Sequence, residues 1–469
     1  MEILRRCPML AVLSAIAAGL ALYDRAGGLA FIAAVPVIFV GVMFCSYEWE
    51  LPEQWQVFAF TMIFTLLCSW RIYAVISSKP PENFVFIAEE GTVTDVREWG
   101  KAYAVVIDTE SRGKYAAFLK FADFMKGTRL KFDGETRGFR PKLNGSDFDE
   151  GKFWRARGVN GVITLHNPEE LPQRFSLSLM RYKLSRKLTI YTPNLTSSYL
   201  RSAWTGERDK SLNDRHRKWG TSHLLAVSGF HVWVVIMCAM YFAGKDPVIL
   251  SVILWVYILL TGAAPSAMRA GLMIQIMLCA KFWKRPYNGV NSVCSAGVIL
   301  LLWSPFLFWD IGWRLSIISA LVIAAVIGSM RNSRLLWLIL SPSVGIAVFP
   351  QAAYTFGNVP VAGFVMNLFA PMYFSFAFSI ASLGALLRLV DFPLSQYFMF
   401  AVEGIFILWE KIADTITALI PYLMGWNYVT AWIGCGTLIY VVCRYLDIAP
   451  IRTAAIMGVI GFIAFALFL

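Results

Sequence analysis

Residues 224–242, LLAVSGFHVWVVIMCAMYF, form an apolar stretch without Lys, Arg, Asp or Glu. About 20 apolar residues are needed for a helix to cross a bilayer, so this stretch predicts a transmembrane helix. Similar runs continue to the C-terminus and also open the chain. Of the 469 residues, 58% are hydrophobic and only 15% are charged. This composition favours a polytopic α-helical membrane protein and argues against an ordinary soluble one.

Outward from this stretch, the apolar runs predict roughly 10–13 transmembrane helices. Residues 1–77 are expected to hold the N-terminal transmembrane helices, and 221–469 the main transmembrane domain. The first run follows Arg5 and Arg6 as a signal peptide would. It lacks a clear cleavage site and further runs follow, so a retained anchor is expected.

The basic loops predict an orientation. If the N-terminus is cytoplasmic, three spans place the long polar region outside the membrane. The basic loops between the later helices then fall on the cytoplasmic side, as the positive-inside rule requires. These loops carry Lys281, Lys284, Arg285, Arg331, Arg334, Arg388, Arg444 and Arg452.

The external polar region divides in two. Residues 78–170 alternate like strands with turn candidates between them, and about five short strands in this length suit a small barrel such as an OB-fold, or another small β-domain. Residues 171–220 are predicted to form a basic amphipathic helix, from Leu171 to Tyr191, and a linker. Such a helix fits anionic lipid headgroups, or an electrostatic lip that guides a polyanion.

The positive charge is concentrated outside. The chain carries a net charge of +12, and residues 77–220 hold 26 Lys and Arg against 18 Asp and Glu. The positive-inside rule predicts the opposite, so an external anionic ligand such as a nucleic-acid backbone is favoured. The residues expected to contact it are Arg97, Lys101, Lys120, Arg155, Arg157, Arg181, Lys183, Arg186 and Lys187.

A polar set opens the first quoted stretch: His223, Ser228, Gly229 and His231. On a helix, Ser228 and His231 share a face. Three interpretations stay open: hydrogen bonding between helices with Gly229 at a close approach, a wet pore wall or gate, or a Ser/His hydrolase. The sequence contains no GxSxG elbow, which argues against the hydrolase interpretation.

Two arginines are expected at membrane depth. Arg269 follows Pro265, and Arg314 lies in a later apolar run. A guanidinium there must face protein, water or a ligand, so either a transported phosphate backbone or a carboxylate such as Asp310 or Glu403 would neutralise Arg269.

Two apolar segments look interrupted. The residues that break them are Gly262, Pro265 and Ser266 in one, and Gly357, Pro360 and Gly363, near Asn367, in the other. Interrupted helices line cavities in many transporters, but simple packing kinks also fit. The acidic and basic stripe within 399–420 either lies at the membrane interface or faces the bundle interior.

Several sites are not expected. The eight cysteines include no CxxC pair, and no spacing typical of a zinc site occurs. No P-loop motif is present. We therefore expect no metal, no cofactor, no catalytic residues and no enzymatic activity, and an energy source elsewhere.

Five segments resemble the ComEC competence-channel family. They are SHLLAVSGFHVWVV (222–235), LLTGAAPSAMRAGLM (259–273), WDIGWRLSIISALVI (309–323), YTFGNVPVAGFVMNLFAPM (354–372) and FDEGKFWRARGVNGVI (148–163). The first is similar to the family's HLLAVSG signature, and the last to the end of its external OB-like domain. Trp313 and Arg314 depart from the family pattern. The chain has no HxHxDH cluster, so a short form without the family's metallo-β-lactamase-like domain is expected.

The resemblance implies a multi-pass protein of the bacterial cytoplasmic (inner) membrane that conducts single-stranded DNA during natural transformation. The expected path residues are His223, Ser228, Gly229, His231, Pro265, Arg269, Arg314 and Asn367. Expected partners are single-stranded DNA, membrane lipids, an outer DNA receptor, a cytoplasmic motor ATPase and a separate nuclease. The alternatives are transport of another polyanion or a lipid-linked substrate, and an intramembrane hydrolase.

Overall fold

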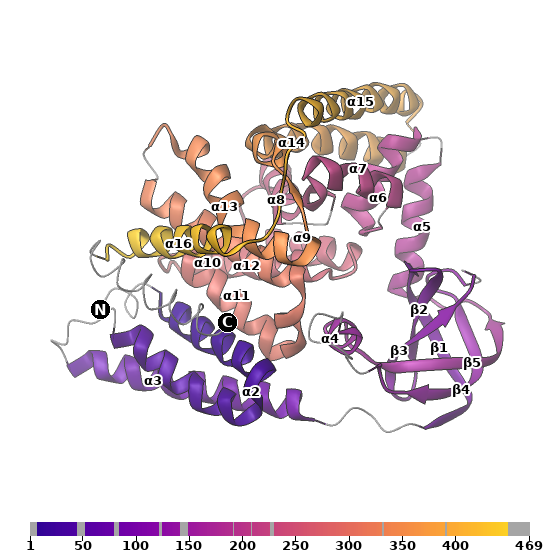
Figure 1. Cartoon of the computed structure of the whole chain (residues 1–469). Helices are drawn as coiled ribbons and strands as arrows, with labels where there is room; N and C mark the ends of the chain where they lie inside the picture. Colours follow the sequence, from indigo (N-terminus) through magenta and orange to yellow (C-terminus); the bar gives the residue numbers. More distant parts are fainter. Residues whose placement is uncertain are drawn as a thin grey trace.

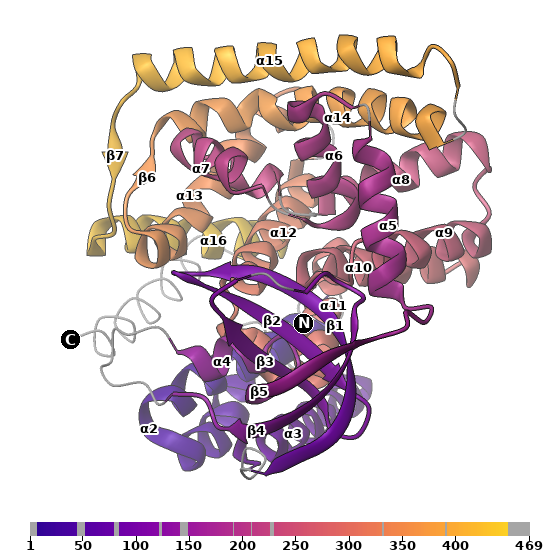
Figure 2. The same ribbon diagram turned by 90° about the vertical axis from the view of Figure 1, so that its right-hand side faces the viewer.

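The computed structural model shows a mostly helical chain with one small β-domain at its side (Figure 1). It describes residues 7–44, 52–78, 84–121, 124–140, 149–190, 192–207, 209–225, 229–330, 333–389 and 392–448. In Figure 2 the β-domain lies in front of the helices. The predicted class, a helical protein with an inserted β-domain, is confirmed at this level.

Five strands form the β-domain and pair in the closed order β1-β2-β3-β5-β4. Their bounds are β1 (Val85–Trp99), β2 (Ala102–Thr109), β3 (Gly113–Leu119), β4 (Arg129–Arg137) and β5 (Val159–Leu171). The long β1 pairs with both β2 and β4, and a bulge between Val93 and Asp95 bends it. Along β4, buried and exposed residues alternate, so one face fills the interior.

Aromatic rings fill the interior of the β-domain. The ring of Phe86 lies 5.6 Å from that of Tyr115 and 6.2 Å from that of Phe132, centroid to centroid. Gly91 lets β1 pass close to β2, because a Cβ there would lie 2.6 Å from Ile107 Cγ2. A short helix, α4 (Glu150–Arg155), precedes β5 and is capped by Asp149.

The predicted basic helix begins later than expected. β5 extends to Leu171, and α5 (Leu177–Thr189) starts after Ser176, whose Oγ accepts the Leu179 N–H at 3.1 Å. This hydroxyl satisfies a backbone donor in the first turn, which fixes the start of the helix. The region expected as a linker holds two more helices, α6 (Asn194–Thr205) and α7 (Lys210–Trp219).

Helices, with two short strands, make up most of the rest of the described chain. Before the β-domain lie α2 (Pro8–Phe44), which is broken at Gly27 with φ +79°, and α3 (Pro52–Ser77). After α7 follow η1 (Ser222–Leu224), α8 (Gly229–Phe242), α9 (Pro247–Leu260), α10 (Pro265–Phe282), α11 (Gly289–Trp303), η2 (Pro305–Trp309), α12 (Ile311–Met330), α13 (Leu336–Phe356), β6 (Val359–Pro360), α14 (Ala362–Leu389), α15 (Ser395–Leu419), β7 (Leu423–Met424) and α16 (Tyr428–Tyr445). Both interruptions predicted from the sequence are helix boundaries, between α9 and α10 and between α13 and α14.

Five described helices are long and apolar enough to cross a membrane: Pro8–Val42, Trp55–Ser77, Ile311–Met330, Leu338–Phe356 and Ala362–Arg388. Three shorter apolar helices are His231–Phe242, Pro247–Leu260 and Gly289–Trp303. These helices indicate a membrane protein. The larger predicted number of spans stays a prediction.

The helices pack in three main apolar groups. One joins α2 and α3 to α11 and α12, a second joins α6 and α7 to α14 and α15, and a third joins α8, α9 and α10. In Figure 2, α14 and α15 run side by side at the top, and α5 extends from the β-domain to this second group. The segment quoted first lies between the second and third groups.

Candidate functional site

Two glycines bring α7 and α14 together just before the quoted segment. Gly220 ends α7 in the left-handed conformation, with φ +72°. A Cβ on Gly220 would lie 2.9 Å from the Cα of Gly363, at the start of α14. Because neither residue has a side chain, the two backbones can touch. This contact fixes the chain immediately before His223.

A buried histidine holds the same turn. The Nε2 atom of His216 on α7 lies 2.7 Å from the Tyr199 hydroxyl on α6, and its Nδ1 atom lies 2.9 Å from Thr221 Oγ1. Burial lowers the pKa of His216 to about 3. The ring is therefore neutral near pH 7, and it joins α6, α7 and the turn into one hydrogen-bonded unit.

The predicted polar set separates in the structure. His223 is exposed in the short helix η1. His231 is buried, and its ring meets that of Phe378 on α14 at 4.7 Å between centroids. Gly229 faces Ala270 of α10, whereas Ser228 lies outside the described residues.

A carboxylate of α15 caps α6. Glu403 accepts the backbone N–H of Thr196 at 2.7 Å and its hydroxyl at 2.6 Å. It also accepts the preceding backbone N–H, of Leu195, at 3.2 Å. Unpaired N–H groups and the helix dipole make a helix N-terminus positive, so a carboxylate there is stabilising. Glu403 is therefore used by α6 and does not neutralise Arg269.

Two more acidic residues of α15 bind α7. Glu410 Oε2 accepts from Arg215 Nη1 at 2.6 Å, and Asp414 Oδ1 accepts from Trp219 Nε1 at 2.8 Å. The acidic residues of the stripe therefore contact the bundle, whereas Lys411 is exposed. The acidic face of α15 thus clamps the helices that lead into the quoted segment.

Arg181 points into the helical part. Its Nε atom donates to the Leu260 carbonyl at 2.9 Å, and its Nη2 atom donates to those of Thr205 at 2.6 Å and Thr261 at 3.3 Å. These carbonyls lie at the C-terminal ends of α9 and α6, where the helix dipole is negative. The predicted external contact at Arg181 is thus replaced by a cap on two helix ends.

Arg269 is the most deeply buried arginine of the predicted path. It is 2% exposed, and its Nη1 atom donates to the Gly312 carbonyl at 2.6 Å. The carboxylate expected to neutralise it, Asp310, instead pairs with Arg157 Nη2 at 3.1 Å. Within the described part of the chain, Arg269 Nε has no hydrogen-bond partner. This guanidinium therefore keeps donor capacity that no described group uses.

The other predicted path residues come from neighbouring helices. Pro265 is the first residue of α10. Arg314 Nε donates to the Phe308 carbonyl at 2.7 Å, and its guanidinium lies 4.8 Å from the centre of the Phe308 ring. Asn367 accepts from Ser341 through its backbone, while its buried Oδ1 has no partner among the described residues.

Five of the nine predicted external contacts are exposed: Lys101, Lys120, Lys183, Arg186 and Lys187. The first two lie on the β-domain, and the other three lie on α5. Arg97 is half-buried and pairs with Asp95, which also binds Lys126 at 3.0 Å. Burial would raise the pKa of Asp95, but these two cations outweigh it and hold the pKa well below its usual range.

Arg155 and Arg157 face the helices instead of the outside. The Arg155 guanidinium lies 5.3 Å from the centre of the Phe306 ring in η2, and Arg157 pairs with Asp310 before α12. Lys152 lies 4.6 Å from the centre of the Trp309 ring. Cations gain from aromatic faces and carboxylates when shielded from water. These residues therefore join the β-domain to the helical part, and the expected DNA contacts at Arg155 and Arg157 do not match their positions.

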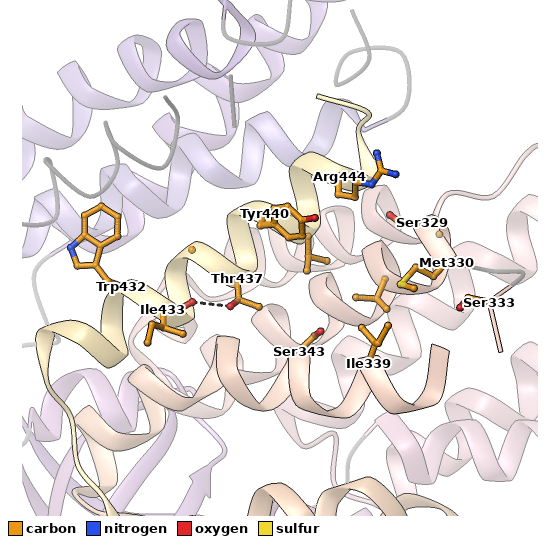
Figure 3. Close-up of a pocket in the computed structure, with 14 residues that line it drawn as sticks. Ser329, Met330, Ser333, Ile339, Ser343, Trp432, Ile433, Thr437, Tyr440 and Arg444 are labelled. Carbon is orange, nitrogen blue, oxygen red and sulfur yellow. Dashed lines mark hydrogen bonds between the residues drawn. The ribbon is translucent and has the colours of Figure 1, made fainter. Parts of the chain in front are cut away.

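The structure also contains a cavity of about 1220 Å³ between α12, α13 and α16 (Figure 3). None of the predicted path residues is among those that line it. The described residues include no group of three or more His, Cys, Asp or Glu arranged to hold a metal ion.

Comparison with known proteins agrees with the sequence motifs. The "Competence protein" family model matches residues 203–449, which is more than half of the chain. ComE operon protein 3 of Bacillus subtilis (strain 168) is 22% identical over 382 residues, which cover 74% of this chain and 49% of that protein. The chain thus spans about half the length of this curated relative. No solved structure matches. The chain belongs to the competence protein family and is a ComEC-type protein.

Proposed function

We propose that this protein conducts single-stranded DNA across the bacterial cytoplasmic membrane during natural transformation. Membership in the competence family supports a role in DNA uptake. In this proposal the β-domain and α5 collect the strand outside, and the helices around the quoted segment form the conduit.

The β-domain supports the first step. Its closed strand order, β1-β2-β3-β5-β4, is compatible with the predicted OB-fold, a barrel that commonly binds single-stranded nucleic acid. Lys101 and Lys120 on this domain are exposed, as are Lys183, Arg186 and Lys187 on α5. Contacts between such cations and backbone phosphates are independent of base sequence, which suits uptake of arbitrary DNA.

Arg269 supports the second step, conduction of the strand between the helices. A buried guanidinium without a full set of acceptors is costly, and each such group requires an explanation. A phosphate accepts hydrogen bonds from a guanidinium in a bidentate geometry. The phosphates of a passing DNA backbone would therefore supply acceptors for the unused N–H groups of Arg269. The exposed His223, in the HLLAVSG-like segment, fits a wet wall of the conduit.

Transport in this proposal needs no catalytic residue in the chain. The sequence contains no P-loop, so a cytoplasmic motor ATPase would supply the pulling force. An outer receptor would deliver the DNA, and a separate nuclease would degrade the strand that is not transported.

A deletion in the host of this protein tests the proposal. Transformation should be abolished, while labelled DNA still binds to the cell surface and stays accessible to added nuclease. Normal transformation in the deletion strain would contradict the proposal. The purified full chain in nanodiscs should bind single-stranded oligonucleotides in a salt-sensitive manner. Equal binding of an anionic polysaccharide would favour transport of another polyanion instead.

A further inference from the structure

The cavity between α12, α13 and α16 is an elongated groove with a polar end and an apolar wall. Figure 3 shows Arg444, Ser329 and Ser333 toward one end of the groove, and Trp432 and Ile433 toward the other. Side chains from α12, α13 and α16 line the groove. Its volume of about 1220 Å³ exceeds that of most small-molecule pockets.

The polar end carries a positive charge that no carboxylate of the described residues pairs with. Arg444 is exposed, and no ion pair of the described residues includes it. Ser329 and Ser333 add hydroxyl groups beside it, and the carboxylate residue Asp447 is not among the residues that line the groove. A guanidinium with adjacent hydroxyls is suited to bind a phosphate.

The rest of the groove is mostly apolar, with Ser343, Thr437 and Tyr440 as its polar side chains. Val326, Ile339 and Val441 line it, and the Thr437 hydroxyl donates within its own helix to the Ile433 carbonyl at 2.8 Å. Thr437 therefore has its hydroxyl hydrogen-bonded inside the helix. At 1.5 Å per residue, Trp432 and Arg444 are separated by about 18 Å along α16, close to half the thickness of a bilayer's hydrocarbon core.

We propose that this groove binds one anionic phospholipid, with its phosphate at Arg444 and an acyl chain along α16. Charge complementarity selects the occupant, because an apolar slot of about one leaflet's depth ends at a cation. The basic loops after α12 and α16 were predicted to be cytoplasmic, where anionic headgroups attract Lys and Arg. The site lies away from Arg269 and is independent of the DNA-uptake proposal.

Photo-crosslinking tests the site. The full chain, in nanodiscs, is labelled with phosphatidylglycerol that carries a photoreactive acyl chain, and adducts are mapped by mass spectrometry. Adducts should concentrate on α12, α13 and α16. Arg444→Ala should reduce them about fivefold, the effect expected for one cation near a headgroup. Thr437→Trp, which fills the slot, should remove most of them.

Matched controls separate this site from general lipid contact. Arg285→Ala removes an exposed cation from another predicted cytoplasmic loop, and Thr415→Trp enlarges an exposed threonine on α15 with the same kind of intrahelical bond. Neither should change the adducts. Equal labelling by a phosphatidylcholine probe, or no effect of Arg444→Ala, would overturn the proposal. So would crosslinks that place residues 449–469 of the chain itself in the groove.

Discussion

Two arginines that point into the helical part, the half-buried Arg181 and the buried Arg269, act differently in the regions where they lie. At the junction of α5, α6 and α9, Arg181 donates to three backbone carbonyls and so closes two helix ends. At the junction of α10 and α12, Arg269 makes one hydrogen bond, to Gly312, and its Nε is unused by the described residues. The comparison teaches that an inward-pointing cation is not by itself evidence of a ligand site. Hydrogen-bond donors that no described group accepts are the stronger indication of one.

Replacing Arg181 should have the largest effect. Arg181→Ala leaves three carbonyls at helix ends without their donor, which should destabilise the fold by about 3 kcal/mol or more. The purified variant should unfold at a clearly lower temperature and accumulate poorly. Lys183→Ala, on the exposed side of the same helix, is the control and should behave like wild type. A normal melting temperature for Arg181→Ala would contradict the claim that Arg181 stabilises the fold by capping two helix ends.

Replacing Arg269 should instead impair transport in a folded protein. If its spare donors bind phosphate, Arg269→Ala should lower the transformation frequency by roughly a hundredfold, as expected when a charged group loses its hydrogen bonds. Arg269→Lys keeps the charge and should retain part of the activity. Protein levels measured in the same strains decide the outcome, because a parallel fall in level would mean that Arg269 is only structural.

His216 should make the α6–α7 region sensitive to acid. Burial lowers its folded-state pKa from 6.5 to about 3. Its contribution to stability is thus full above pH 6.5 and is lost as the pH falls toward 3, since the unfolded chain takes up the proton first. The melting temperature should fall more steeply from pH 7 to 4.5 in wild type than in His216→Gln. Equal slopes would show that other groups, such as Glu410 and Asp414, set the acid response.

The smallest effect is expected on the β-domain surface. Lys101 and Lys120 are exposed, so replacing both with Ala should leave stability unchanged and weaken binding of single-stranded DNA by only a few fold. The log–log slope of affinity against salt concentration should become shallower by about 0.7 for each phosphate that the variant no longer neutralises. An unchanged slope would place the DNA-binding surface elsewhere. Arg155 and Arg157 are poor choices for this test because they hold the domain in place.

The sequence predicted the positions of helices better than the contacts that side chains make between them. Apolar periodicity and the Gly and Pro residues located the apolar helices and both interruptions, because these are local properties of the chain, whereas the more polar α6 and α7 were missed. The inward direction of Arg157 and Arg181 could not be predicted. Their partners are 153 residues away, at Asp310, and 79 residues away, at Leu260. A basic residue in an external segment has the same local pattern whether it faces water or a helix end.

The same limit applies to His216 and α15. The sequence shows the acidic stripe of α15 as a pattern. Whether the stripe faces the membrane interface or the bundle could not be predicted without knowing that α6 and α7 pack against this helix. His216 was not singled out, because its partner Tyr199 lies on another helix. The regular spacing of Glu403, Glu410 and Asp414 was the available indication that these helices would meet.

Several contacts hold the β-domain to the helices, and two of them involve different helices. One is α4, whose cations rest on the aromatic rings of η2, and the other is α5, anchored through Arg181. A single hinge would leave such a domain free to swivel, whereas a pair of attachments removes that freedom. The β-domain is therefore kept in one orientation relative to the helices.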